Sequence, residues 1–188
     1  DEARAVAQSR AGYEAGRAGR HAEAVTLISR AINSSALSLE NLVVAYNNRA
    51  LAYFNLGRAD LSLADYGRAI LLRPGDPALY LNRAKVLRAK ARYDEALADL
   101  SRAVELSPGQ PAPLALRADL YENLRQHAKA LADYAEVVRL RPDLPEGHAT
   151  RGAILRRLGR FEEAQAEASR AIELAPDRAD YYYNRAIV

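Results

Sequence analysis

The sequence predicts an all-α fold made of repeated pairs of helices. Prolines recur every 34 residues, at Pro74, Pro108, Pro142 and Pro176. Arginines recur with the same spacing, and each is followed by alanine or glycine; they are Arg49, Arg83, Arg117, Arg151 and Arg185. Apolar residues inside each unit are spaced three and four apart, as on one face of a helix. A fixed period of this length indicates an array of helical repeats.

The unit 43–76 shows the expected elements. Its apolar pattern predicts one helix over about 41–56 and a second over about 59–72, with the turn at Gly57. Pro74 ends the second helix because proline has no N–H and disfavours helical geometry in the residue before it. A further set of prolines is expected at the first position of the next helix, namely Pro77, Pro111 and Pro145.

The period breaks at both ends of the chain. The first unit has no closing proline and is followed by about four extra residues, so we expect a helix to end near Asn33 and the next to begin after the N-cap Ser38. At the other end, the residues from 179 begin a sixth first helix with no second helix. We expect its apolar face, with Tyr182, Ala186 and Ile187, to pack on the fifth unit.

This unit resembles the tetratricopeptide repeat of bacterial proteins. Tyr46, Ala50, Tyr53, Ser62, Ala69 and Pro74 match its pattern of large, small, aromatic and closing proline positions. The resemblance implies a right-handed α-solenoid of about five full repeats plus a partial sixth. It implies a single array over 1–188, with repeats at about 5–38, 43–76, 77–110, 111–144, 145–178 and 179–188.

The composition suits a soluble chain with mixed surface charge. Basic and acidic residues number 27 and 24, for a net charge of +3 that is spread along the sequence. We therefore expect a solvated surface rather than a nucleic-acid site. No apolar run approaches the roughly 18 residues of a membrane span, so we expect no membrane-spanning segment.

The residue types that are absent bear on processing and location. The chain contains no methionine, which predicts that it was trimmed or that a leader was removed before Asp1. It contains no cysteine, so the redox compartment stays open and both the bacterial periplasm and the cytoplasm are compatible with the sequence.

Motifs of catalysis and cofactor binding do not occur in the sequence. We find no glycine-rich phosphate loop, no paired His-Glu motif and no serine elbow. His21, His127 and His148 fall in different repeats, so we expect packed or half-exposed side chains rather than metal ligands. The sequence thus predicts a protein that is not an enzyme, without a catalytic residue, a cofactor or a metal site.

Four of the recurring arginines are each followed, sixteen positions later, by an acidic residue in the second helix. The pairs are Arg49–Asp65, Arg83–Asp99, Arg117–Asp133 and Arg151–Glu167. The first unit lacks both members, with Ala11 and Leu27 at those positions. We expect bidentate ion pairs that join the two helices of a repeat, rather than a basic ladder for an anionic ligand. The alternative is local pairing of the acid with an arginine three residues later in its own helix.

The resemblance also implies where a partner binds. In this family the first helices line a concave groove, and ligands contact a fixed set of positions on them. Carried onto this chain, the expected protein- or peptide-binding residues are Asn47, Asn48, Leu51, Phe54, Asn55, Asn82, Lys85, Arg88, Asp119, Glu122, Arg156 and Asn184. Asparagine suits an extended peptide because its amide both donates and accepts hydrogen bonds.

One subgroup of the family holds the terminal carboxylate of chaperone tails with a two-lysine, two-asparagine, one-arginine clamp. Of its slots only the one at Asn48 is matched here, so a chaperone tail is not the expected ligand. The leading functional hypothesis is a non-catalytic scaffold or adaptor for a protein segment. The alternatives are a module that self-associates through the open C-terminal helix, and a regulatory fragment of a larger enzyme or of an export or secretion machine.

Overall fold

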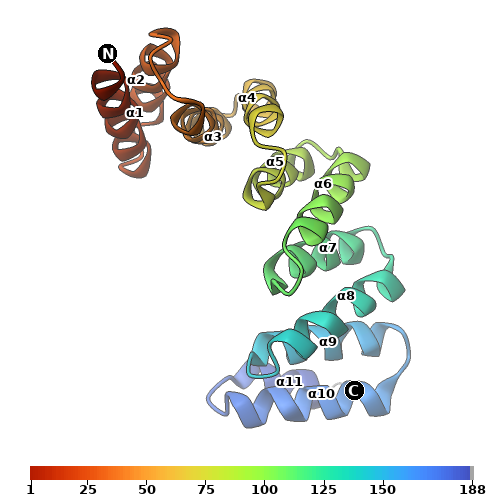
Figure 1. Ribbon diagram of the computed structural model, residues 1–188. Coiled ribbons are helices and arrows are strands. Elements are labelled where there is room, and N and C mark those ends of the chain that lie inside the picture. Colours follow the sequence, from red (N-terminus) through yellow and green to blue (C-terminus); the bar gives the residue numbers. More distant parts are fainter. Residues whose placement is uncertain (187–188) are drawn as a thin grey trace. The chain divides into compact units, whose positions relative to one another are not determined.

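The computed structural model describes residues 1–186, without the side chains of Tyr183, Asn184 and Ala186, and all regular elements in this part are helices (Figure 1). They are α1 (Glu2–Arg17), α2 (His21–Asn33), α3 (Leu39–Asn55), α4 (Ala59–Leu72), α5 (Pro77–Ala89), α6 (Tyr93–Leu106), α7 (Pro111–Asn123), α8 (His127–Leu140), α9 (Pro145–Arg157), α10 (Phe161–Leu174) and α11 (Ala179–Ala186). The predicted all-α fold of helix pairs is confirmed.

The chain divides into two compact units, Asp1–Leu106 and Ser107–Val188. In the first unit the pairs α1–α2, α3–α4 and α5–α6 each pack together, and the odd-numbered helices contact one another. In the second unit the pairs are α7–α8 and α9–α10, and α11 packs on α10 and α9. That all these repeats form one array over 1–188 stays a prediction of the repeat pattern.

The turn inside each helix pair requires one residue in the left-handed backbone region. Gly57 fills this place after α3 with a φ of +72°, and its N–H donates to the carbonyl of Phe54. Glycine adopts this conformation without steric cost. Ala91 and Arg125 hold the same place in two other pairs, at φ values of +56° and +57°, so the tertiary structure imposes the turn even where a side chain opposes it.

The predicted helix boundaries are largely confirmed. Prolines begin α5, α7 and α9, and α4 has the predicted range. The first helix of the second repeat, α3, starts at Leu39 rather than at 41. Ser38 precedes it as predicted, but its hydroxyl accepts from the Asn41 side chain at 2.9 Å and makes no capping bond to a backbone N–H.

The predicted ion pairs between the two helices of a repeat are confirmed. Nε and Nη2 of Arg49 donate to the two carboxylate oxygens of Asp65 at 2.6 and 2.9 Å. Arg83 and Arg117 hold Asp99 and Asp133 in the same bidentate way, at 2.7–2.8 Å. The acids are nearly inaccessible to solvent, so these pairs act inside the repeat and not as a ligand site.

The fifth repeat uses a variant of this pair. Arg151 donates from Nη1 to Glu167 at 2.5 Å, and the second carboxylate oxygen lies 2.7 Å from Nδ1 of His148. His148 stands at the repeat position of Tyr80. Its Nε2 lies 3.1 Å from the Pro142 carbonyl, where the Tyr80 hydroxyl donates to Pro74 at 3.0 Å. In the fifth repeat, Glu167 and His148 therefore take the places that Asp99 and Tyr80 hold in the third repeat.

The alternative of local pairing holds for one acid only. Arg68 donates to Asp65 at 2.7 Å in addition to Arg49. Arg102 and Arg170 instead donate to the acids three residues after them, Glu105 and Glu173, so local pairing with Asp99 and Glu167 is wrong. The reason is the residue three positions after each arginine: Arg102 and Arg170 have a glutamate there, whereas Arg68 has Leu71.

Arg49 is the most enclosed of these arginines. Its Nη1 donates to the Ser29 hydroxyl of α2 at 3.0 Å, and its guanidinium lies 5.5 and 5.7 Å from the ring centres of Tyr46 and Tyr53. Burial opposes the charge of Arg49, yet the hydrogen bonds and attraction of Asp65 outweigh it and raise the pKa of Arg49. One side chain thus connects α2, α3 and α4.

The expectation for α11 is wrong in one residue. Tyr181, not Tyr182, packs on Ala171 and Ile172, while Tyr182 is 43 % exposed. Tyr182 stands at the repeat position of Tyr80, which packs in a cluster with Ala103 of the second helix of its own repeat. The side chain of Ala186 and all of Ile187 lie outside the described residues.

Loss of one buried carboxylate should destabilise the first unit strongly. Asp65→Ala leaves the Arg49 guanidinium buried without its counter-charge, so we expect the free energy of unfolding to fall by about 3–5 kcal/mol in urea denaturation. The control is Asp60→Ala, which removes a carboxylate that is 80 % exposed and paired with Lys90, and should change stability little. Equal losses in the two variants would contradict a structural role of the buried pair.

Two glycines of α1 should respond to alanine in opposite directions. A Cβ at Gly12 would lie 2.5 Å from Cγ1 of Ile28 and 3.1 Å from the Ala24 carbonyl oxygen, so Gly12→Ala should lower the free energy of unfolding by about 1–3 kcal/mol. At Gly16 the nearest atom is 3.6 Å away. Gly16→Ala should raise stability by up to about 1 kcal/mol through helix propensity. Thermal denaturation of both variants checks the difference in sign.

Candidate functional site

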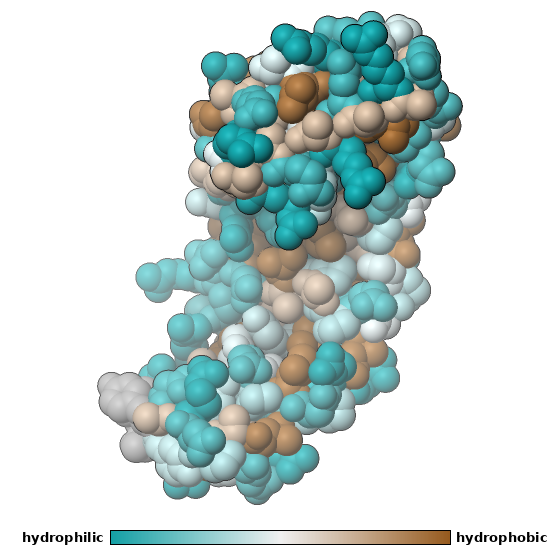
Figure 2. Space-filling model, turned by 90° about the vertical axis from the view of Figure 1, so that its left-hand side faces the viewer, coloured by the Kyte–Doolittle hydropathy of each residue, from teal (hydrophilic) through white to brown (hydrophobic). Residues whose placement is uncertain are grey.

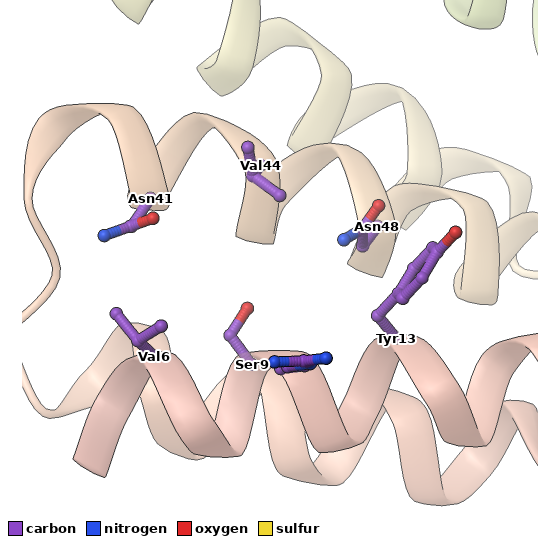
Figure 3. A pocket seen from close by; sticks show the side chains of 7 residues that line it. Val6, Ser9, Tyr13, Asn41, Val44 and Asn48 are labelled. Carbon is purple, nitrogen blue, oxygen red and sulfur yellow. The ribbon is translucent and has the colours of Figure 1, made fainter. Parts of the chain in front are cut away.

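Two adjoining cavities lie between α1 and α3 in the first unit, and Figure 3 shows the larger one. The larger has a volume of about 300 Å³ and the smaller about 90 Å³, and both are lined by Tyr13 and Asn48. Together they form what we call the α1–α3 groove. Its main lining residues are Val6, Ser9, Arg10, Tyr13, Gly16 and Arg17 of α1 and Asn41, Val44, Asn48, Leu51 and Asn55 of α3.

The helical period explains why these residues face one another. The lining side chains of each helix are spaced three and four apart and so share one face. Figure 3 shows Val6, Ser9 and Tyr13 directed from α1 toward the side chains of Asn41, Val44 and Asn48 on α3. Because Gly16 has no side chain, space is left at the second cavity.

One end of the groove is held together by hydrogen bonds. The Glu2 carboxylate of α1 accepts from the backbone N–H of Ser38 at 3.1 Å and from the Asn41 amide at 3.2 Å. These hydrogen bonds, those from Ser38 foremost, hold the pKa of Glu2 below its usual value. The start of α1 is thereby tied to the start of α3.

The groove exposes apolar surface that the fold does not cover. The exposed fractions of Tyr13, Val44 and Leu51 are 42 %, 46 % and 49 %. Their position along one groove distinguishes them from isolated apolar residues on the surface. On the face of the molecule shown in Figure 2, apolar and hydrophilic residues are otherwise interspersed.

Three asparagines form a relay of amides beside the groove. Asn82 of α5 donates from Nδ2 to Oδ1 of Asn47 at 3.1 Å, and Asn47 donates to Oδ1 of Asn48 at 3.2 Å. The oxygen of Asn48 is thus occupied by Asn47. Its NH₂ group is the part left to donate to an occupant of the groove.

The predicted binding residues of the first unit take four kinds of position. Asn48, Leu51 and Asn55 line the groove, and Asn47 and Asn82 form the relay. Lys85 and Arg88 are exposed on α5. Phe54 is partly buried and packs against the core of Ala50, Tyr66 and Val86.

The predicted acidic residues of the second unit have partners within that unit. Asp119 accepts from the Tyr134 hydroxyl at 2.7 Å; burial and this contact raise the pKa of Tyr134. The Glu122 side chain is only 13 % exposed, lies 2.5 Å from His127 Nδ1, and pairs with Arg157. Arg156 is half-buried, and the side chain of Asn184 lies outside the described residues.

The predicted site did not include the α1 wall. Val6, Ser9, Arg10, Tyr13, Gly16 and Arg17 stand 38 residues before Val44, Asn47, Asn48, Leu51, Phe54 and Asn55. They are therefore the equivalent positions of the first repeat once the four-residue insertion is counted. That register was the signal from which the wall could have been found.

Neither a metal cluster nor a bilayer-crossing helix is found in the described part of the chain. Within residues 1–186 no three His, Cys, Asp or Glu side chains come together as metal ligands. Nor does any helix there combine the length and apolarity needed to cross a bilayer.

Several solved structures share this fold. A MamA protein superimposes with a TM-score of 0.79 at 16 % identity, covering 94 % of both chains. MamA from Desulfovibrio magneticus RS-1 gives 0.78 at 20 % identity over 94 % of this chain and 97 % of that one. YrrB, described as a TPR protein with an unusual peptide-binding site, gives 0.75 at 18 % identity over 95 % and 90 %.

Comparisons of the sequence with family models identify the type of repeat. No curated protein shows significant sequence similarity to the chain. Three family models, each described as a tetratricopeptide repeat, match residues 47–111, 113–144 and 145–178. Together with the helix-pair architecture, these matches show that the chain belongs to the tetratricopeptide repeat family.

Proposed function

We propose that this protein is a non-catalytic scaffold that binds an extended segment of a partner protein in the α1–α3 groove. The observation that carries the proposal is the row of exposed Tyr13, Val44 and Leu51 beside the donor amide of Asn48. An extended segment offers side chains for the apolar surface and backbone carbonyls for the amide.

Comparison with known proteins supports the class of function. A tetratricopeptide repeat chain offers protein or peptide binding as its general activity, and YrrB, which shares this fold, is a protein with a peptide-binding site. The groove of this chain is open along its length and lies between two helices of the first unit. It therefore has the form that an extended ligand needs.

Leu51 and Leu61 give a matched test of the groove. Both are leucines with similar exposed fractions, 49 % and 47 %, but Leu51 lines the groove and Leu61 lies on α4. Peptides selected from a displayed library of random 16-residue sequences serve as probes, and fluorescence anisotropy gives their dissociation constants. We expect Leu51→Ser to weaken binding by about tenfold or more, because it removes an apolar anchor, and Leu61→Ser to leave it unchanged.

The proposal fails if no displayed peptide binds, or if the two serine variants weaken binding equally. Circular dichroism of both variants checks that the helices are intact. Variants of Asn82 and Arg88 extend the test to α5, where the same peptides should lose affinity if the ligand continues past the relay.

A second candidate function is self-association through α11. The observation in its favour is the 43 % exposure of Tyr182 on this helix. Multi-angle light scattering across a range of protein concentrations should then show a mass that rises with concentration, and Tyr182→Ser should restore the monomer mass. A constant monomer mass in the unaltered protein rules this candidate out.

A further inference from the structure

The residues that line the α1–α3 groove include basic residues and no acidic ones. Arg10 and Arg17 line the groove, and Lys85 and Arg88 occupy the corresponding face of α5. None of the residues lining either cavity is Asp or Glu. Glu2 at the end of the groove already accepts hydrogen bonds from Ser38 and Asn41, and the exposed Glu14 of α1 is not among the lining residues.

These four cations have no acidic partner among the described residues. Some exposed arginines elsewhere do: Arg20, Arg92 and Arg160 each pair with a glutamate three residues later at 2.6–2.8 Å. Others, such as Arg30 and Arg58, do not, but they line neither cavity of the groove. The guanidinium of Arg17 lies 5.9 Å from the ring centre of Tyr13, which holds the charge beside the apolar surface.

In the second unit, the corresponding face of α7 carries acidic residues that have partners within that unit. Asp119 and Glu122 stand at the repeat positions of Lys85 and Arg88. Tyr134 donates to the first, and His127 and Arg157 contact the second. In the fourth repeat these two positions are therefore acidic and have partners within the unit, so their basic character is not a property of the repeat as such.

The hydrogen-bond donors in the groove also favour an anionic ligand. The Asn48 oxygen accepts one hydrogen bond from Asn47, and the N–H groups of Asn48 remain to donate. Guanidinium groups only donate, and Arg10 and Arg17 add such donors on the opposite wall. An occupant rich in acceptor oxygens satisfies these groups, and a carboxylate does so with opposite charge.

From these observations we infer that the α1–α3 groove recognises an acidic protein segment, with Asp or Glu side chains around at least one aliphatic or aromatic side chain. The inference rests on the proposed function and adds the chemistry of the ligand. The carboxylates pair with Arg10 and Arg17, and the apolar side chain contacts Tyr13, Val44 and Leu51. Nucleic acid is the less suitable polyanion, because the aromatic rings among the lining residues are those of Tyr13 and His21 alone, and stacking of successive bases needs several.

The test uses three sets of fluorescein-labelled 16-residue peptides on a Gly/Ser background. The first set carries four glutamates around one leucine, the second has glutamine in place of glutamate, and the third keeps the glutamates but has glycine in place of leucine. We expect the first set to bind at least tenfold more tightly than either other set. Its affinity should fall as NaCl is raised, because exposed charge pairs are screened.

Charge reversal provides the matched control. The variant Arg10→Glu/Arg17→Glu should weaken binding of the first set by at least tenfold. The variant Arg30→Glu/Arg58→Glu changes the net charge equally at two exposed arginines outside the groove, and should bind as the unaltered protein does. Circular dichroism again confirms folding.

The outcomes separate the inference from the proposed function. If library-selected peptides bind in a Leu51-dependent way but the glutamine set binds as tightly as the glutamate set, the groove binds protein segments and the acidic preference is wrong. If none of the three sets binds, or if both charge-reversal variants lose affinity equally, the inference is also overturned. Tighter binding of a fluorescein-labelled 16-nucleotide oligothymidylate than of the acidic set would assign the basic groove to nucleic acid instead.

Discussion

The structure depends on one interaction, the buried pair between an arginine of the first helix and an acid of the second. A helix pair has few ways to specify its own geometry when many of its buried residues are alanines, because contacts of alanine are small and have no direction. A bidentate arginine–carboxylate pair does have direction and a fixed length. Arg49 with Asp65 shows the effect most fully, since the same guanidinium also reaches Ser29 of the preceding repeat.

Sequence reasoning found this interaction because it repeats. The arginine and its acidic partner recur at the same repeat positions, and both are absent from the first repeat. The pairing can therefore be inferred from the sequence alone. The helices and their turns were predictable for the same reason. The local details were not: Glu167 needs His148 to complete what aspartate does alone elsewhere, and a single copy of such an exchange carries no periodic signal.

The binding face was predicted only in part, and the physical reasons differ between residues. Asn48, Leu51 and Asn55 line the groove because their positions follow from helical geometry. The wall opposite them was hidden by the insertion between α2 and α3, which moves the first repeat out of phase. Glu122 looked free in the sequence, but its partners His127 and Arg157 come from two other helices, and a pattern within one helix cannot reveal them.

The first repeat differs from the others in lacking the ion pair, and its helices meet through Gly12 and Ile28 instead. An apolar contact contains no Coulomb attraction for dissolved ions to screen. Added salt therefore leaves the packing of α1 on α2 in place while it weakens attraction between the groove and a charged ligand. Ionic strength therefore acts on the attraction of a charged ligand and spares the contact between α1 and α2, so salt separates recognition at the groove from the packing of its α1 wall.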